Sequence, residues 1–574
     1  MRRIAIIGAG QSGAQLALGL RSTGRYDVTL VTDRGPDQIR SGPVMSSQCM
    51  FETALQTERD LGLNLWDDEA PVIDGVSLTL TGEDGTSGVS WSAPFEGRAQ
   101  SVDQRVKCAA WIEQFEKEGG RLVLREAGIA DLEEYALTHD LVIVSTGKGD
   151  LGRLFPRNAE ESVYDRPQRV LALTYVTGAA PRMDPSRIDF RTIPGVGEYF
   201  TFPALTVSGP CEIMVFEGVL DGPMDCWDDV RTPEGHLERS LEILRQFVPD
   251  EYERCREARL TDDGGVLRGR LTPVVRRPVG QLPSGRHVLG LADAVVLNDP
   301  ITGQGSNNAA QAAHLYLESI LRRDEEEFTP EWMRKTFDTF WRGWAQWVVG
   351  WTNSLLDAPL AHHRELVEAA AETPGVARAL AAGFDDPRTM YRWWFDAAEA
   401  RRFLAEKRAQ EAAAFDGRDF RRALGQYATG VTVVTARAAD GRKVGMTANS
   451  FTSVSLEPPM VLWCPGRNAP SLPDFTAASH FAINILAADQ HHLSRQFATP
   501  SDDKFAGTPV TEGVGGTPLL DGALARLQCR TVQCIDAGDH VVMLGEVEAY
   551  DAPGGEPLVF HSGAYRVATK HPDF

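Results

Sequence analysis

One short segment near the N-terminus constrains the fold more than any other. An apolar run at 4–7 leads directly into Gly8-x-Gly10-x-x-Gly13, and a second apolar run ends at Asp33. Gly8 permits a tight turn, Gly10 lets the backbone approach a pyrophosphate, and Gly13 lets a helix pack on the preceding strand. This spacing predicts a strand–helix–strand unit that holds an adenine dinucleotide at the helix N-terminus, with Asp33 on ribose hydroxyls. A glycine-rich turn without a ligand is the alternative, and the complete strand–helix–strand context disfavours it.

A second glycine-rich segment follows another buried strand candidate at 288–291. After that strand come Asp293 and the run Asp299-Pro-Ile-Thr-Gly-Gln-Gly-Ser-Asn-Asn308. A carboxylate at a strand end can bind ribityl hydroxyls. A glycine-rich loop that opens a helix directs backbone amides at an anion, here the N1–C2=O edge of a reduced flavin. An ordinary strand–loop–helix connection is the alternative for this segment taken alone.

The remaining sequence divides the chain into two parts that differ in composition and in predicted secondary structure. A buried strand at 141–144 ends in Ser-Thr-Gly, strands separated by turns fill 165–280, and residues 330–400 are helical and Trp-rich. A stretch rich in Ala, Glu, Arg and Lys then indicates a solvated helical connector. We predict an N-terminal part at 1–400, a helical linker at 401–415 and a C-terminal part at 416–574.

Two aromatic features of the helical region have plain structural interpretations. Trp341, Trp344, Trp347 and Trp351 recur at roughly helical spacing, which favours a buried core stripe over the wall of a substrate site. The pair at 362–363, His-His, has no accompanying acid cluster and is expected on the solvated surface.

The C-terminal part consists of short strands split by Gly, Pro and Asp turns, which is typical of a closed or split β-barrel. Between two of these strands lies a dense run of hydroxyl and amide groups that can hydrogen-bond an isoalloxazine edge and its phosphate tail. A polar surface strand is the alternative. The run contains Thr447, Asn449, Ser450, Ser453 and Ser455.

Composition excludes several classes of function. The sum of 58 basic and 80 acidic residues is −22, which argues against a nucleic-acid or anionic-membrane surface. Eight cysteines without a CxxC pair signal neither a disulfide framework nor a metal site. No apolar run is long enough for a membrane span, and the N-terminus enters a strand directly, so we expect a cytoplasmic protein.

Residues 1–400 resemble the FAD monooxygenases of the single-component hydroxylase superfamily, above all the oxygenase components of styrene and indole monooxygenases. The resemblance is carried by GAGQSG, the SVDQR segment, Ser-Thr-Gly at 145–147 and GLAD…DPITGQGSNNA. It implies an α/β Rossmann-like FAD-binding domain with an inserted β-sheet substrate domain and C-terminal helices. It also implies an FAD site made of Gly8, Gly10, Ser12, Gly13, Asp33, Arg105, Thr146, Gly147, Asp293, Pro300, Gly303, Gln304, Gly305 and Asn307.

One motif and one loop depart from that superfamily. Hydroxylases that reduce their own flavin carry an Asp-Gly motif before the Ser-Thr-Gly region, and this sequence has none there. The first part is therefore expected to receive FAD that was reduced elsewhere. The flavin-side loop, at Val44 to Ser47, differs from the Leu- and Asn-rich loop of the main family and predicts a modest rate of oxygenation.

Residues 416–574 resemble the short-chain NAD(P)H:flavin reductases with a split-barrel fold. The resemblance runs from 420–464 through Phe481-Ala-Ile-Asn484, Lys504 and Ala-Gly-Asp-His540 to Phe560-His-Ser-Gly-Ala-Tyr565. It implies that Asn484 and Lys504 join the polar run at the flavin and that His540 lies near the nicotinamide. Without the resemblance, His540 is a turn residue that precedes a strand.

Together these features predict a self-sufficient flavoprotein. Its reductase half reduces FAD with NADH, and its oxygenase half uses reduced FAD and O2, through a C4a-hydroperoxide, to epoxidise aromatic alkenes such as styrene and indole. No general base is apparent that could activate a phenol. An aromatic hydroxylase with a fused reductase and a flavin-binding redox sensor or carrier are the alternatives. The split-barrel resemblance further implies a homodimer formed through the reductase half.

Overall fold

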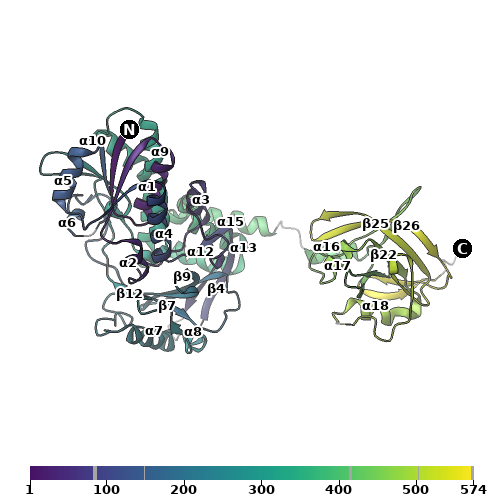
Figure 1. Cartoon of the computed structure of the whole chain (residues 1–574). Coiled ribbons are helices and arrows are strands. Elements are labelled where there is room, and N and C mark those ends of the chain that lie inside the picture. Colours follow the sequence, from purple (N-terminus) through teal and green to yellow (C-terminus); the bar gives the residue numbers. More distant parts are fainter. Residues whose placement is uncertain (82–86, 148, 413–416, 502, 570–574) are drawn as a thin grey trace. The chain divides into compact units, whose positions relative to one another are not determined.

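The computed structural model describes residues 1–81, 87–147, 149–412, 417–501 and 503–569. The chain forms two compact units, Met1–Ala413 and Ala414–Phe574 (Figure 1).

Unit 1 contains a six-stranded sheet that carries the N-terminal glycine motif. Its order is β14-β15-β6-β1-β2-β5, and all neighbours are parallel except β14, which pairs antiparallel with β15. The four residues of the apolar run in β1 are at most 3% exposed, because both faces of the sheet are covered, and this explains why the run does not alternate with polar residues. The strands are β1 (Arg2–Ile7), β2 (Tyr26–Thr32), β5 (Arg121–Leu124), β6 (Leu141–Val144), β14 (Val279–Gln281) and β15 (His287–Gly290).

Helices pack against this sheet and against one another. α1 contacts both α9 and α4, and α10 packs on α9. The helices of this layer are α1 (Gln11–Ser22), α2 (Pro36–Arg40), α3 (Glu52–Asp60), α4 (Gln104–Lys117), α5 (Ile129–Thr138), α9 (Gly305–Arg323) and α10 (Pro330–Phe340), with a short α6 (Gly149–Gly152).

The second sheet of unit 1 has eight strands and is assembled from two separate stretches of sequence. Its path is β11-β7-β10-β9-β8-β3-β4, with β12 also on β7, and it is antiparallel except where β3 pairs with β8. The sequence predicted strands between 165 and 280, whereas β3 and β4 come from residues before 101. The strands are β3 (Val72–Thr81), β4 (Ser87–Gln100), β7 (Arg169–Thr177), β8 (Arg187–Ile193), β9 (Gly197–Thr206), β10 (Gly209–Val219), β11 (Arg259–Leu260) and β12 (Val266–Gly269).

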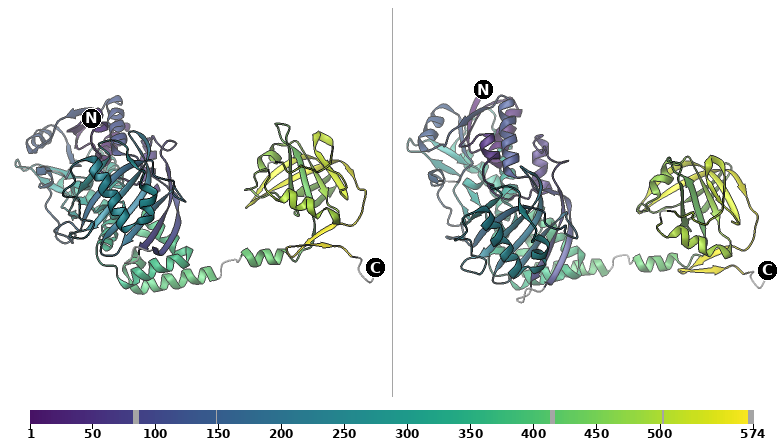
Figure 2. Two further views of the ribbon diagram at one scale, coloured as in Figure 1. Left: turned by 90° about the horizontal axis from the view of Figure 1, so that it is seen from below. Right: turned by 60° about the horizontal axis from the view of Figure 1, so that its bottom comes forward.

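Each face of the second sheet has its own apolar cluster. One face packs on α7 (Pro233–Phe247) and α8 (Pro249–Cys255), which Figures 1 and 2 show lying along the sheet. The other face packs on the helices that follow α10 in the sequence. These are α11 (Gln346–Leu356), α12 (Ala361–Glu372), α13 (Pro374–Asp385), α14 (Tyr391–Phe395) and α15 (Ala397–Ala412). A small two-stranded sheet joins β13 (Val274–Val275) to β16 (Val296–Leu297).

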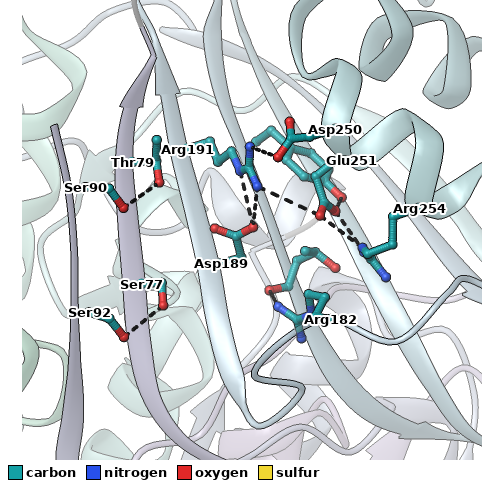
Figure 3. Close-up of polar contacts among 12 residues, drawn as sticks. Ser77, Thr79, Ser90, Ser92, Arg182, Asp189, Arg191, Asp250, Glu251 and Arg254 are labelled. Carbon is teal, nitrogen blue, oxygen red and sulfur yellow. Dashed lines mark hydrogen bonds and ion pairs between the residues drawn. The ribbon is translucent and has the colours of Figure 1, made fainter. Parts of the chain in front are cut away.

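An ion-pair network fixes α8 to the second sheet (Figure 3). Arg191 on β8 lies 2.7 Å from Asp250 at the start of α8. Arg254, near the end of the same helix, lies 2.8 Å from both Glu212 on β10 and Glu251. Charges of both signs thus lie in contact, and their ion pairs anchor this helix to the sheet.

The tryptophan-rich region divides between the two apolar clusters of unit 1. A π-helical turn at Trp341–Ala345 separates α10 from α11. Trp344 joins the core of the first sheet, whereas Trp351 packs in the second cluster, with its ring 5.1 Å from that of Phe384. Trp344 and Trp351 are therefore core residues, as expected, but of two different cores, whereas Trp341 and Trp347 are only partly buried.

The structure corrects two sequence-based expectations near the end of unit 1. His362 and His363 are buried rather than solvated, because both imidazoles hydrogen-bond the Trp394 carbonyl, at 2.8 and 2.9 Å. The stretch expected to be a solvated linker is helical, but the first half of α15 packs into unit 1. Leu404 is buried there, and Phe403 stacks on Trp393 with ring centroids 4.4 Å apart.

Unit 2 is built on a seven-stranded antiparallel sheet with the order β19-β18-β22-β25-β26-β21-β20. Its end strands, β19 and β20, are joined by the three residues 449–451, so the sheet must curl until its two ends meet. The strands are β18 (Thr432–Arg437), β19 (Lys443–Ala448), β20 (Thr452–Leu456), β21 (Pro459–Trp463), β22 (His480–Ile485), β25 (Ala525–Ala537) and β26 (His540–Asp551).

Smaller elements complete unit 2. A three-stranded sheet contains β17 (Thr429–Gly430), β27 (Leu558–His561) and β28 (Ala564–Val567), and a two-stranded one contains β23 (Val510–Glu512) and β24 (Pro518–Leu520). The helices are α16 (Gly417–Leu424), α17 (Leu472–Ala477) and α18 (His491–Ala498).

Candidate functional site

The motifs singled out in the sequence meet at one edge of the parallel sheet in unit 1. Ile7 pairs with Val31 and with Val144, and Gly290 pairs with Val144, so β1, β2, β6 and β15 end at the same level. The loops that carry Gly8–Gly13, Asp33, Thr146–Gly147 and Asp293 therefore all leave the sheet at its carboxyl edge. In open α/β sheets this edge is where ligands bind.

Gly8 and Gly13 have no room for a side chain, whereas the space beside Gly10 is open. Gly8 has a φ of +109°. A Cβ at Gly13 would overlap the Gly8 carbonyl oxygen, so α1 can begin here only with glycine. A Cβ at Gly10 would meet nothing within 4 Å, and this residue is exposed directly before α1. Ser12, next to this opening, is buried. The turn thus leaves room at Gly10 for a group that approaches the backbone.

A second helix N-terminus presents the same arrangement at Gly305. The residues of the short turn Pro300–Thr302 end at Gly303, whose φ is +65°, and α9 then begins at Gly305. Gly305 is exposed, and a Cβ there would meet nothing within 4 Å. Helix N-termini attract anions, because their first N–H groups lack partners within the helix.

The two helices run in the same direction. A Cβ at Gly19 of α1 would press on the side chain of Leu317 of α9, so the helices touch there. At the opposite edge of the sheet, Arg2 donates to the carbonyl of Asp324, just after α9, at 2.6 Å. Both N-termini therefore point toward the carboxyl edge.

Asp293 stands open to solvent at this edge, with protein on its other sides. Burial by the surrounding chain raises the pKa of its carboxyl to about 6, and the positive charge of Arg276 opposes the shift. The preceding Ala292 has a φ of +50°, a conformation that costs a non-glycine residue energy. A Cβ at Gly147 would lie 2.9 Å from the Asp293 carbonyl oxygen, so only glycine lets the two loops approach so closely. Asp33, at the end of β2, is also exposed.

Arg105, expected on the flavin, has a structural role instead. Its guanidinium is 1% exposed and lies 2.8 Å from Asp103 and 2.7 Å from Asp262. It also donates to the Gly42 carbonyl and to the hydroxyl of Thr206, at 3.2 and 3.1 Å. These acceptors occupy its donors, so Arg105 holds the 42–44 loop in place. Asp262 lies 157 residues away from Arg105 in the sequence, and it is not among the residues predicted from the sequence.

Asn307 and Gln304 are likewise occupied by the chain. The Asn307 amide donates to the Cys49 carbonyl and accepts from the Phe51 N–H, both at 2.8 Å. It thereby joins residues 49–51 to α9. The Gln304 amide donates to the Phe384 carbonyl at 2.7 Å. The structure thus makes both side chains supports of the loops rather than free donors.

Several buried acceptors near these loops lack a hydrogen-bond partner among the described residues. They are Gln48 Oε1, Gln304 Oε1 and Asn308 Oδ1. Buried polar atoms are rarely left unpaired, so each of them is a position that a water molecule or a polar ligand could satisfy.

Aromatic rings pack against one another between the loops and the second sheet. The ring centroids of Phe51 and Phe95 lie 5.4 Å apart, and those of Phe51 and Phe384 lie 5.8 Å apart. Val44 and Ile301, one from each loop, are buried in the same cluster. This side of the site is apolar and suits an aromatic molecule.

In unit 2 the residues predicted to bind the flavin or the nicotinamide form two groups, and Asn484 lies apart from both. Thr447 donates to the Ser494 carbonyl at 2.7 Å, and Lys504 to the Phe497 carbonyl at 2.8 Å, so both lie against α18. Burial lowers the pKa of the Lys504 ammonium.

The second group flanks residues 464–466. Ser450 accepts from the Cys464 N–H at 2.9 Å, and His540 forms an isolated bridge with Gly466. The His540 imidazole lies 2.8 Å from the Asp539 carboxylate and is half exposed. Asn449 and Ser453 are close to Ser450 in the sequence, and both are exposed. Ser455 accepts a hydrogen bond from the Glu457 N–H at 3.2 Å.

Asn484 lies apart from these two groups, because it is fully buried. It donates to the Val433 carbonyl and the Thr435 hydroxyl, and it accepts from the Leu520 N–H at 2.8 Å. Asn484 therefore joins β22 to its neighbours and has no free group for a ligand.

Two families match the chain. Residues 424–569 match "Flavin reductase like domain", and residues 147–254 match "Styrene monooxygenase A putative substrate binding domain". FMN reductase (NADH) SmoA of Agrobacterium fabrum is 46% identical over 150 residues, which are 26% of this chain and 85% of that protein. Styrene monooxygenase StyA of Pseudomonas fluorescens is 28% identical over 368 residues, 62% of this chain and 86% of that protein.

A third relative is the reductase component of the flavin-dependent trigonelline monooxygenase of Acinetobacter baylyi. It is 44% identical over 153 residues, 27% of this chain, and the chain spans about half of its length, 49%. Through unit 2, the chain belongs to the flavin reductase like family. Unit 1 is homologous to StyA, so one polypeptide joins a styrene-monooxygenase-like unit to a flavin reductase unit. In the parts of the chain that the structure describes, no helix has the length and apolarity needed to cross a membrane.

Proposed function

We propose that unit 1 is a Rossmann-like domain that binds FAD along the carboxyl edge of its parallel sheet. One observation carries this proposal: two parallel helices present exposed glycines, Gly10 and Gly305, with open space in front of them at that edge. The residues fit the cofactor. Gly10 would admit the pyrophosphate, the α9 N-terminus would face the flavin, and Asp33 and Asp293 would accept from ribose and ribityl hydroxyls.

The reaction proposed for unit 1 is epoxidation of an aromatic alkene such as styrene or indole. Reduced FAD supplies the activation of O2 when it is bound. The chain's own contribution is to hold the flavin and to keep the aromatic-lined region by Phe51 and Phe384 free of bulk water. The relationship to StyA of Pseudomonas fluorescens supports this substrate class.

Unit 2 would supply the reduced flavin. The proposal is a split barrel in which NADH transfers hydride to FAD, with Thr447 and Lys504 on the flavin and His540 near the nicotinamide. It is supported by the curled seven-stranded sheet and by the relationship to the FMN reductase (NADH) of Agrobacterium fabrum. A need for NADH favours a cytoplasmic location.

The proposal includes a homodimer formed through unit 2. Its end strand β20 exposes two large apolar side chains, Val454 at 48% and Leu456 at 88%. Large apolar side chains that are exposed favour association with another protein surface. Sedimentation of the full chain and of Leu456→Glu tests this, since the variant should lower the dimer fraction.

The deciding experiment is a product analysis of the full chain with NADH, FAD, air and either styrene or indole. We expect styrene oxide from styrene and a blue pigment from indole. Ring-hydroxylated products from phenols but no epoxide would favour the aromatic hydroxylase. Hydrogen peroxide equal to the NADH consumed, with no oxygenated product, would leave a reductase that serves a sensor or carrier.

A further inference from the structure

Two buried carboxyl groups face one another between the second sheet of unit 1 and the glycine-rich loop. Glu217 lies on β10 and is 0% exposed, and Asp299, directly before the turn at 300–302, is 1% exposed. The two carboxyl groups lie close enough for each to affect the ionisation of the other. The pair joins a strand of the second sheet to the loop that leads to Gly305.

No N–H or O–H group among the described residues donates to either oxygen of Glu217 or to Oδ2 of Asp299. The other oxygen of Asp299 accepts from the Ile301 N–H at 3.2 Å and caps the 300–302 turn. Two ionised carboxylates cannot hydrogen-bond each other, so these buried oxygens can be paired with one another only if one of the two carboxyl groups keeps a proton.

In the parts of the chain that the structure describes, no ion pair joins a cation to either carboxyl group, and the charge of Arg169 reaches them only from its own pair with Glu198. Arg169, the nearest, holds Glu198 with two bonds of 2.8 and 3.1 Å. It spends further donors on the carbonyls of Gln168 and Leu356. Within the described parts of the chain, no group of three or more His, Cys, Asp and Glu side chains forms a metal site.

We propose that Glu217 and Asp299 share one proton at neutral pH and that this proton positions the 299–305 loop against the second sheet. Glu217 is thus a positioning residue for the oxygenase reaction. The inference rests on the proposed function in one respect, that this loop holds the flavin.

The charges around the pair agree with this arrangement. Burial, followed by the negative charges of Asp299 and Glu198, raises the pKa of Glu217 well above its usual range, and Arg169 opposes the shift only weakly. Burial also raises the pKa of Asp299. Tyr164 is the other titratable group close enough to feel Asp299, and its own pKa is raised. A second ionisation would place two like charges in contact, which would push the loop away from β10.

Infrared spectroscopy tests the proton directly and does not depend on a flavin. The full chain at pH 7 should show a carbonyl band of a protonated carboxylic acid that moves in D2O and is absent in Glu217→Gln. Glu238→Gln, an exposed carboxyl on α7, is the matched control and should leave the band unchanged. A wild-type spectrum without that band, or a band that survives in Glu217→Gln, overturns the proposal.

The positioning role is tested with chemically reduced FAD and styrene supplied to the full chain without NADH. Glu217→Gln keeps a donor and the charge of the singly protonated pair. Its product yield at pH 7 should stay within about twofold of wild type, and it should hold at alkaline pH where wild type declines. Glu217→Leu leaves Oδ2 of Asp299 without any donor, and its product yield should fall about tenfold.

NADH oxidation by unit 2 should be equal in all of these variants, and circular dichroism melts show whether unit 1 of each variant folds. Equal yields from Glu217→Leu and wild type, or parallel pH profiles of wild type and Glu217→Gln, would overturn the positioning role. If the wild type itself makes no product, the proposed function fails, while the infrared result still decides whether the proton is shared.

Discussion

At the scale of single residues, the space beside a glycine shows whether it can admit a ligand or is needed only for packing. Gly10 has open space where Gly13 has the Gly8 carbonyl oxygen. Gly10→Val should therefore fold normally and lose product formation from reduced FAD, because its side chain would block approach to the backbone. NADH oxidation should persist.

Gly13→Ala is the matched variant and should lower stability by about 1–3 kcal/mol through overpacking. Circular dichroism melts combined with product analysis check both. A Gly10→Val chain that still converts styrene would show that the cofactor does not approach this turn.

Asp293 gives a pH prediction with opposite signs for binding and for stability. Its folded pKa is about 6, above the roughly 3.9 of an unfolded aspartate. The folded state thus retains a proton that the unfolded state has lost, so this group's contribution to stability falls as pH rises from about 4 to 6.

FAD binding should change in the other direction, because a carboxylate accepts from hydroxyls better than a carboxylic acid does. Product yield from reduced FAD should decline below pH 6 in wild type, and Asp293→Asn should flatten that decline. Thermal melts without flavin should show Asp293→Asn gaining stability relative to wild type as pH rises through the same window. Identical profiles for the two proteins would contradict the assignment.

At the scale of elements, the sequence predicted the parallel strands and the sheet edge at which their motifs meet. It did not predict which side chains hold the loops at that edge. Apolar runs at 4–7, 141–144 and 288–291 became neighbouring parallel strands, so motifs at their ends came together. Arg105 and Asn307 were expected on the flavin, yet each bonds a segment far away in sequence. Local spacing carries no information about such partners.

The same limit applies to whole elements. β3 and β4 join the second sheet from residues before 101, because β3 pairs with β8 across more than a hundred residues of chain. The regular tryptophan spacing suggested one stripe, whereas the π-helical turn at Trp341–Ala345 sends Trp344 and Trp351 into different cores.

Arg105 can be tested as a structural residue of the 42–44 loop. Arg105→Met leaves Asp103, whose side chain is 0% exposed, as an uncompensated buried charge. The loss should be about 3–5 kcal/mol of unfolding free energy in the absence of any flavin. Denaturant unfolding measures this, and Arg98→Met, at an exposed arginine, is the control. Unchanged stability with weakened FAD binding would restore the role implied by the resemblance.

At the scale of the whole molecule, the boundary between the units determines where the chain can be cut. Leu404 and Phe403 pack into unit 1, so a fragment ending at 400 loses part of its core, whereas one ending at 413 keeps it. The shorter fragment should be less stable by about 2–5 kcal/mol, the usual cost of removing a buried leucine. Thermal melts of both fragments decide this, and equal melting temperatures would place α15 outside the fold of unit 1.

Joining the two units in one chain should matter most when the enzyme is dilute. A tether holds the two sites at an effective concentration of about millimolar, whereas separate fragments meet only at their bulk concentration. Reduced FAD released by unit 2 either reaches unit 1 or reacts with O2 in solution to give peroxide. The full chain should therefore keep its ratio of epoxide to NADH on dilution, while an equimolar mixture of 1–413 and 414–574 should lose it.

Excess free FAD should lower the ratio of epoxide to NADH in both samples, because more reduced flavin then escapes into solution. Chiral chromatography of the epoxide beside NADH and peroxide assays gives the ratio. If the mixture and the full chain respond equally to dilution, flavin passes between the units through solution and the fusion confers no advantage in coupling.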